Sequence, residues 1–218
     1  MLAPTAILGY GFPVDSFKKG LEENPHVIGV DAGSTDPGPY YLGKGKSFTD
    51  REAVKRDLII ILEAACSRNI PVVIGTAGGC GGKVHVDWNI EIIKEVAKER
   101  GLSFKMARID AEFSQEFVLN RLKQGDVLPL EGVPSLTSEN VLNSTRIVGQ
   151  MGVEPIQKAL DQGAQVIVAG RAYDPVCFSA LPIMKGFDEG LANHLGKILE
   201  CAAIAATPGD GRDCMLGI

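Results

Sequence analysis

The sequence predicts an α/β fold in which a mainly parallel sheet carries helices on both faces, as in a Rossmann-like layered sandwich. Short apolar segments alternate with longer amphipathic segments about five times along the 218 residues. A strand, helix, strand order requires crossover connections, which place successive strands in parallel. The composition, 45% hydrophobic and 22% charged, is that of an ordinary globular domain. We therefore expect a single α/β domain over residues 1–218, with a subdomain boundary near the turn-rich segment 126–136.

The predicted strands are short, apolar and rich in β-branched residues, and polar or glycine-rich loops follow them. Segment 26–31 ends at Asp31. Segment 104–109 likewise ends just before an aspartate, Asp110. The remaining predicted strands are 5–10, 72–74, 166–169 and 215–218.

The predicted helices carry apolar residues three and four positions apart, which forms one core-facing stripe. Thr49 and Glu52 fit a capping box at the start of a helix that ends near Asn69. Ser114 is expected to cap a helix that stops at Gly125. The predicted helices are 14–23, 49–69, 86–100, 114–125, 137–150, 156–162, 176–184 and 190–206.

Charge and cysteine usage exclude several classes of protein. The net charge of -5 and the isoelectric point near 5.3 argue against a general nucleic-acid binder, which carries a basic face. No apolar run approaches the roughly 18 residues of a membrane span, and the N-terminus lacks the basic region of a signal peptide. The five cysteines are widely spaced and form no CxxC motif, so we expect reduced thiols and a cytoplasmic location. No metal-ligand spacing is present, and whether the protein uses a cofactor is unknown from the sequence.

The stretch GTAGGCGGKVHVDW, residues 75–88, is the strongest candidate for a functional segment. Glycine lets the backbone approach a ligand, and a strand-to-helix junction presents free amides to an anion. Because ligands of open α/β sheets bind at the carboxyl ends of strands, we expect the loops there to bind a small anionic substrate. The expected ligand-binding residues are Asp31, Gly33, Ser34, Asp36, Thr76, Gly78, Gly79, Gly81, Gly82 and Glu154. The expected catalytic residues are His85, Asp174 and Arg171.

Each candidate also has a purely structural interpretation. The glycines could form a tight turn, because they match neither GxxxxGK[ST] nor GxGxxG. Segment 31–36 could be an Asx-turn and N-cap cluster. Arg171 and Asp174 could be a local ion pair of little energetic consequence. His85 could simply pack against Trp88.

Long motifs along nearly the whole chain point to one family. The motifs are DAGSTDPGPYYLGKGKSFT (31–49), REAVKRDL (51–58), GTAGGCGGKVHVDW (75–88), IVGQMGVEP (147–155), AGRAYDPVCFSALPIMKGF (169–187) and KILECAAIA (197–205). Together they resemble the acyclic terpene utilisation family typified by AtuA. The resemblance implies small-molecule catabolism through carboxylates or CoA thioesters. It also implies a protein of about twice this length, of which these residues are the N-terminal half. Family members usually read Asp-Pro-His where this chain has Lys83-Val84-His85, and alanine where it has Cys80.

We expect an enzyme or enzyme subunit that moves a proton next to a carbonyl, by hydration, dehydration or isomerisation. His85 or Asp174 would move the proton, Arg171 would fix a carboxylate, and the 78–82 amides would hold an anion or oxyanion. One alternative is a non-catalytic ligand-binding half, completed by a C-terminal domain or by another subunit as in a homo-oligomer. A second is a metal-dependent hydrolase that uses Asp31, Asp36, Asp110 and His85. No nucleic-acid or membrane partner is expected.

Overall fold

The computed structural model describes residues 1–34, 38–210 and 212–218. The main sheet contains, from one edge to the other, β4 (Met106–Ile109), β7 (Val166–Ala169), β3 (Val72–Gly75), β2 (Ile28–Asp31), β1 (Leu2–Ala3) and β8 (Met215–Leu216). Every neighbouring pair is parallel except β1 with β8. This mostly parallel sheet confirms the predicted fold class.

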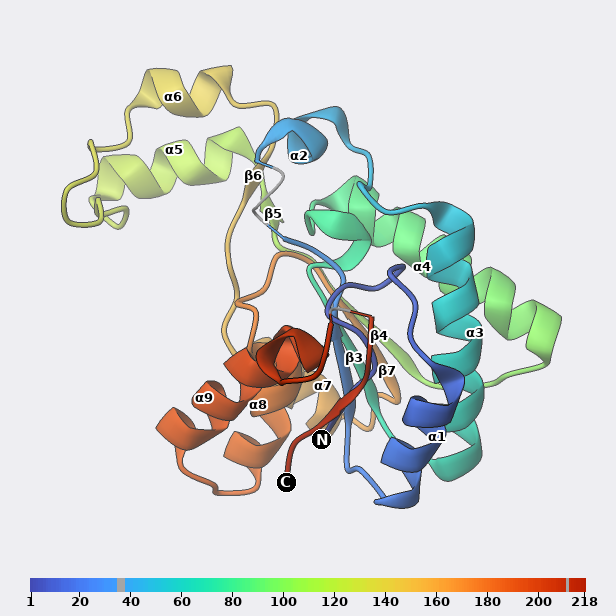
Figure 1. Ribbon diagram of the computed structural model, residues 1–218. Coiled ribbons are helices and arrows are strands. Elements are labelled where there is room, and N and C mark those ends of the chain that lie inside the picture. The colour runs from blue at the N-terminus through green and yellow to red at the C-terminus, as the bar shows by residue number, and fades with distance from the viewer. Residues whose placement is uncertain (35–37, 211) are drawn as a thin grey trace.

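Helices cover both faces of the sheet (Figure 1). One face carries α1 (Val14–Glu22), α3 (Arg51–Arg68) and α4 (Lys83–Arg100), and the other carries α7 (Glu154–Asp161), α8 (Val176–Met184) and α9 (Glu189–Glu200). Successive strand residues point to opposite faces. Val72 and Ile74 of β3 therefore enter one core cluster, and Val73 enters the other. Within the described ranges, no helix combines the length and the apolar character that crossing a membrane requires.

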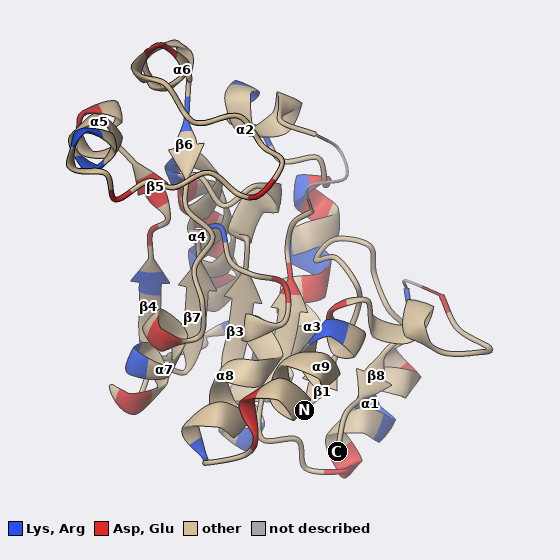
Figure 2. Ribbon diagram, turned by 90° about the vertical axis from the view of Figure 1, so that its left-hand side faces the viewer, with Lys and Arg blue, Asp and Glu red and all other residues tan. Residues whose placement is uncertain are grey.

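The carboxyl ends of the parallel strands share one edge of the sheet. The strand register pairs Asp31 of β2 with Gly75 of β3, and Ile109 of β4 with Ala169 of β7. In Figure 2, β4, β7 and β3 point toward the edge near which α2 (Tyr40–Lys44) lies. The loops that follow these strands are therefore neighbours, as the strand pattern predicted.

Between β4 and α7 the chain leaves the body of the protein and forms a projecting arm, residues 112–148 (Figure 1). In the arm, β5 (Glu112–Phe113) pairs antiparallel with β6 (Ile147–Val148), and α5 (Gln115–Gln124) and α6 (Ser138–Asn143) lie beyond that pair. Leu128 and Leu130, in the connection between the two helices, are 80% and 78% exposed. The arm thus presents apolar side chains to solvent.

Several predicted element boundaries were wrong. The first strand is Leu2–Ala3 rather than 5–10. The helix predicted over 137–150 ends at Asn143, because the following residues pair with β5 as β6. The last predicted helix breaks at Glu200 and continues as a 3-10 turn, η2 (Ala202–Ala205). α2 lies in a segment that was predicted to be loop.

Two capping residues were predicted at helix starts, and the structure confirms one of them. Ser114 does cap α5, since its Oγ accepts from the Phe117 amide at 3.1 Å. The cap of α3 is Asp50 rather than Thr49, because the Asp50 carboxylate accepts the amides of Glu52 and Ala53 at 3.0 Å. α4 begins at Lys83 rather than at residue 86. The earlier start places His85 inside the first turn of α4.

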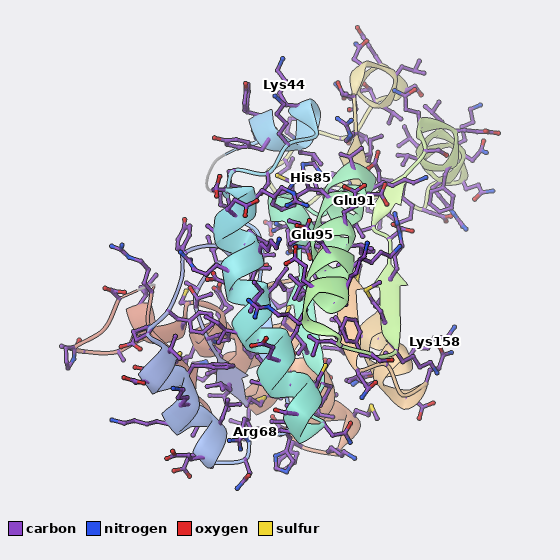
Figure 3. The ribbon with its side chains drawn as sticks, turned by 90° about the vertical axis from the view of Figure 1, so that its right-hand side faces the viewer. Lys44, Arg68, His85, Glu91, Glu95 and Lys158 are labelled. Atoms are coloured by element: carbon purple, nitrogen blue, oxygen red, sulfur yellow. The ribbon has the colours of Figure 1, made fainter. Side chains whose placement is uncertain are left out.

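A seam of ion pairs joins α3 to α4 (Figure 3). Glu95 of α4 accepts from Arg51 Nη2 at 2.6 Å and from Lys55 Nζ at 2.5 Å, and Lys55 also donates to Glu99 at 2.8 Å. The hydrogen bonds from Arg51 and Lys55 lower the pKa of Glu95 to about 2. In Figure 3, His85 lies at the upper end of this seam, below α2. The seam therefore holds the C-terminal half of α4 against the start of α3.

A buried carboxylate explains why residues 5–10 form a loop. Asp57 of α3 is fully buried, and its Oδ2 accepts from the Gly9 amide at 2.8 Å and from the Gly11 amide at 3.0 Å. Arg56 donates to Oδ1 from Nε at 3.0 Å and from Nη2 at 2.8 Å. These donors compensate the carboxylate for its lost hydration. The loop amides thus bond to a helix side chain instead of a strand.

Replacing Asp57 with alanine should destabilise the protein by about 2–4 kcal/mol, because the Gly9 and Gly11 amides would lose their acceptor inside the fold. Urea unfolding measures the difference. Asp15→Ala is the matched control, since the Asp15 side chain is 93% exposed, and it should change stability by less than about 0.5 kcal/mol. Equal unfolding midpoints for the two variants would contradict this role of Asp57.

Candidate functional site

Asp31 lies near the centre of the edge at which the parallel strands end, and it is only 3% exposed. Its Oδ1 accepts from the Gly33 amide at 3.2 Å. Burial raises the pKa of Asp31 well above its usual range, and the nearby Asp174 and Glu200 raise it further, while Arg171 opposes them. Asp31 therefore retains its proton at pH values where an exposed aspartate has lost it.

A chain of opposite charges lies beside Asp31. Arg171 Nη2 is 3.8 Å from Asp174 Oδ1. Lys197 Nζ of α9 is 2.9 Å from Asp174 Oδ2 and 2.5 Å from Glu200 Oε1. Burial lowers the pKa of Lys197, but its hydrogen bonds to Asp174 and Glu200 outweigh that effect and raise it overall. We call Asp31, Arg171, Asp174, Lys197 and Glu200 the charged cluster.

The sequence identified only part of this cluster. Asp31, Arg171 and Asp174 follow strands, so the rule that ligands bind at strand ends selects them. Lys197 and Glu200 lie on α9 and come to the edge because α9 packs against α8. Nothing in their local sequence separates them from other polar helix residues, and only the packing of α9 could have revealed them.

The glycine-rich loop packs against other parts of the protein backbone. A Cβ on Gly33 would meet the Gly79 carbonyl oxygen at 2.3 Å, and a Cβ on Gly78 would meet the His85 carbonyl oxygen at 2.3 Å. A Cβ on Gly81 would stand 2.1 Å from the Arg171 amide nitrogen. These close approaches provide a structural reason for the glycines. The loop is a tightly packed junction between three strand ends.

Thr76 belongs to the same junction. It has a φ of 47°, which is unusual for a β-branched residue. Its Oγ1 accepts from the Ala172 amide at 3.3 Å and so connects the end of β3 to the end of β7. The backbone strain is held by this side-chain bond and by burial on all sides.

The N-terminus of α4 binds a carboxylate side chain of the protein itself. Glu112, the first residue of the arm, accepts from the Lys83 amide through Oε2 at 2.6 Å. A carboxylate at this position is favoured both by the free amides of the first turn and by the helix dipole. Glu112 thus occupies a position that the sequence suggested for an anionic substrate, and sequence reasoning did not identify it.

His85 is buried to 1% exposure under the segment that contains α2. Its Nε2 lies 3.2 Å from the carbonyl oxygens of both Tyr41 and Lys46. Burial lowers the pKa of His85, the hydrogen bonds to the Tyr41 and Lys46 carbonyls partly oppose it, and the weaker effects of Arg146 and Glu112 lower and raise it respectively. His85 is therefore neutral at pH 7, with its hydrogen on Nε2, because both neighbours of Nε2 are acceptors.

Arg146 fastens the α2 segment from the other side. Its Nη1 donates to the Leu42 carbonyl at 3.2 Å and to the Gly43 carbonyl at 2.6 Å. These carbonyls lie at the end of α2, where a cation is favoured. His85 and Arg146 together hold the α2 segment over the start of α4.

A hollow of about 280 Å³ opens beside His85. Its lining includes Lys46, Arg51, Trp88 and His85, so His85 and Trp88 do border a common space. A larger hollow of about 370 Å³ lies between α1 and β8. Neither lining includes Asp31 or Arg171. The charged cluster and the hollow beside His85 are therefore separate features of the strand-end edge.

The remaining predicted site residues are placed as follows. Ser34 lies next to the glycine loop and its amide bonds to the Gly79 carbonyl at 3.3 Å. Asp36 lies outside the described residues. Glu154 is exposed at the first position of α7. It follows Met151, which pairs with Ala172 at the exit of β7.

The proposed metal-ligand set does not come together in the part of the chain that the structure describes. Asp110 forms an ion pair with Arg108 at 2.8 Å, and Arg108 also contacts Asp87. Among residues 1–34, 38–210 and 212–218, no group of three or more His, Cys, Asp or Glu side chains is arranged to hold a metal ion. Cys80 is a buried thiol whose pKa burial raises, although Arg171 opposes the rise.

Comparison with known proteins identifies one family. A family model described as acyclic terpene utilisation family protein AtuA matches residues 48–209. Neither the curated proteins nor the solved structures contain a significant match to this chain. The matched range includes the glycine-rich loop, His85, the arm and the charged cluster other than Asp31.

Proposed function

This chain belongs to the acyclic terpene utilisation AtuA family, and on that basis we propose that it is an enzyme of small-molecule catabolism that transfers protons next to a carbonyl group. Its substrate is a carboxylate or a CoA thioester, and the reaction is a hydration, a dehydration or an isomerisation. The observation that carries the proposal is the Asp31 carboxyl, which is buried near Arg171 and Asp174 and whose pKa that burial raises well above its usual range. Strongly shifted carboxyl groups next to a charge partner are typical of acid–base sites.

Four members of the charged cluster have a role in this proposal. Asp31 donates a proton, as a carboxyl group with a raised pKa can do near neutral pH. Arg171 lies 3.8 Å from Asp174, beyond normal hydrogen-bond length, so its guanidinium can engage a substrate carboxylate as a fork. Asp174 or His85 is the proton acceptor, and Lys197 orients Asp174 through a 2.9 Å ion pair. Glu154 and Ser34 border the same loops and contribute to ligand binding.

Deuterium exchange tests the proposal without requiring the natural substrate. The protein is incubated in D2O with 3-methylcrotonyl-CoA or with its free acid, and mass spectrometry measures deuterium incorporation. Arg171→Met and Asp174→Asn should each lower the exchange rate by about 100-fold or more. Arg121→Met and Asp126→Asn are the matched controls, since they remove an exposed ion pair of the arm. Unchanged exchange in both cluster variants would refute the proposed chemistry.

A second candidate function, a ligand-binding half that needs a partner, is supported by the exposed apolar side chains. Leu128, Leu130 and Leu191 are 80%, 78% and 71% exposed. Exposed apolar side chains that gather on one surface mark a contact with a partner, and Leu128 and Leu130 lie two residues apart in the arm. Light scattering of the purified chain distinguishes the candidates: a monomer that catalyses exchange alone excludes this alternative, and activity confined to an assembly supports it.

A further inference from the structure

Two hydrogen-bond acceptors lie beside Gly82, near the position that a Cβ would take. A Cβ built on Gly82 would stand 3.1 Å from His85 Nδ1 and 3.1 Å from Glu112 Oε2. The two atoms are therefore no farther apart than twice that distance. Gly82 has a φ of -73° and a ψ of 165°, which any residue can adopt. The backbone conformation does not require glycine here, and what disfavours a Cβ is crowding by His85 Nδ1, Glu112 Oε2 and, at 3.3 Å, Leu42 Cδ1.

Both atoms present lone pairs to that space. His85 Nε2 donates toward the carbonyls of Tyr41 and Lys46, so Nδ1 of the neutral ring is an acceptor. In the described part of the chain, Nδ1 has no hydrogen-bond partner, although His85 is 1% exposed. Glu112 Oε2 accepts from the Lys83 amide and has a further lone pair. A buried acceptor without a donor is energetically unfavourable, which favours a ligand that donates hydrogen bonds.

We propose that Gly82, His85 and Glu112 bind one hydroxyl-type hydrogen-bond donor: a water molecule in the free protein, and the hydroxyl group of a hydroxy acid or its thioester in the substrate complex. Water has two hydrogens and can serve both acceptors. In hydration chemistry, the oxygen that enters as water becomes the hydroxyl of the product, so one site takes both species. The binding of a substrate hydroxyl rests on the proposed function, whereas the binding of water rests on the geometry alone.

A backbone hydrogen bond joins the loop that carries the site to Arg171. Gly81 accepts from the Arg171 amide at 3.1 Å, and Gly82 follows it at a Cα spacing of about 3.8 Å. In the hydration direction, an O–H bond of the water breaks, its proton passes to His85 Nδ1, and the oxygen forms the new C–O bond. The electron pair of the C=C bond takes a proton at the neighbouring carbon from the Asp31 carboxyl. The imidazolium that forms faces the Glu112 carboxylate, which stabilises it.

Nitrogen-15 NMR of the histidine side chains and a high-resolution crystal structure test the water site. His85 should be the neutral Nε2–H tautomer with a hydrogen-bonded Nδ1, and a water should lie between Nδ1 and Glu112 Oε2. Gly82→Ala should remove the water and shift the Nδ1 resonance toward that of a free lone pair. Gly43→Ala is the matched control, because a Cβ at Gly43 meets no atom within 4 Å, and it should change neither signal.

Two results would overturn the water site: an imidazolium at pH 7 that donates Nδ1–H to Glu112, or an Nδ1 resonance that Gly82→Ala leaves unchanged. If Gly82→Ala fails to fold, Glu112→Gln replaces it. A glutamine amide can donate to Nδ1 directly, so it should also displace the water. Retention of the water in Glu112→Gln would count against the site.

Titration with 3-hydroxybutyrate and butyrate tests whether the site binds a substrate hydroxyl. Because a site built to hydrogen-bond a hydroxyl discriminates against an analogue that lacks it, 3-hydroxybutyrate should bind at least about tenfold more tightly and shift the His85 Nδ1 resonance. Gly82→Ala should abolish the preference. Equal binding of the two acids overturns the hydroxyl half. A clear preference without deuterium exchange would instead show that the proposed reaction is wrong and the site is right.

Discussion

Replacing Gly81 with alanine should destabilise the folded protein by about 4 kcal/mol or more, which only a few kinds of substitution achieve. The new Cβ would stand 2.1 Å from the Arg171 amide nitrogen and 2.5 Å from the Arg171 Cα. Both are backbone atoms, so no side-chain rotation can relieve the clash. The Gly81 carbonyl also accepts from that amide at 3.1 Å, and the substitution would separate the two loops that this bond joins.

Gly101→Ala provides the matched control for this prediction. Gly101 has a φ of +63° against +69° for Gly81, but a Cβ at Gly101 meets no atom within 4 Å. Alanine at position 101 therefore adds only the left-handed backbone penalty, about 1 kcal/mol. Chemical denaturation of both variants isolates the effect of the clash. If Gly81→Ala loses no more stability than Gly101→Ala, the two loops do not pack in this way.

Converting Asp31 to asparagine should stabilise the protein at pH 7 and lower the rate of deuterium exchange by about 100-fold or more. Asparagine keeps the size of the side chain and an oxygen for the Gly33 amide. It removes the cost of burying an ionisable carboxyl that is only 3% exposed. It also removes the proton that the proposed chemistry uses. Stability and activity should therefore change in opposite directions, as they often do at functional sites.

The pH dependence of stability tests the Asp31 prediction independently of activity. The pKa of Asp31 is raised in the folded state, above about 3.9 in the unfolded chain. The folded state therefore binds the proton more tightly, so the contribution of Asp31 is fully present below about pH 4. That contribution is lost as the pH rises from there through the folded-state pKa.

Thermal unfolding at pH 4 and pH 7 measures this loss. The gain of Asp31→Asn over the natural chain should be larger at pH 7 than at pH 4. Asp110→Asn is the control, since Asp110 also follows a strand but is paired with Arg108 and half exposed. An Asp31→Asn gain that is the same at both pH values would show that Asp31 ionises normally in the fold.

Much of the fold could be predicted because local patterns specify it. The strand 166–169 and the helix 176–184 were predicted with the bounds that the structure has, since each is a compact apolar segment between clear turn residues. The failures have specific physical causes. Residues 5–10 form a loop in which the Gly9 amide bonds to Asp57 instead of to a strand, and the Gly11 amide just beyond them does the same. The helix predicted from residue 137 stopped early because residues 147 and 148 pair with β5.

The residues of the candidate site could also be predicted only in part. The rule that ligands bind at strand ends selected Asp31, Arg171 and Asp174, and the structure brings their charges together. Glu112 could not be selected, because its role depends on the arm folding back onto the start of α4. His85 was selected for its chemistry, but its neutral tautomer depends on two carbonyls more than thirty residues earlier in the chain.

By itself, the sequence determined the order of strands and helices, the parallel sheet and the edge at which polar groups gather. These properties follow from local periodicity and from the connections that parallel strands require. Only the tertiary structure decided that Gly78 and Gly81 pack against backbone, that the protein's own Glu112 binds the start of α4, and that burial raises the pKa of Asp31. Those properties depend on distances of a few ångströms between residues remote in the chain, and no local pattern encodes such distances.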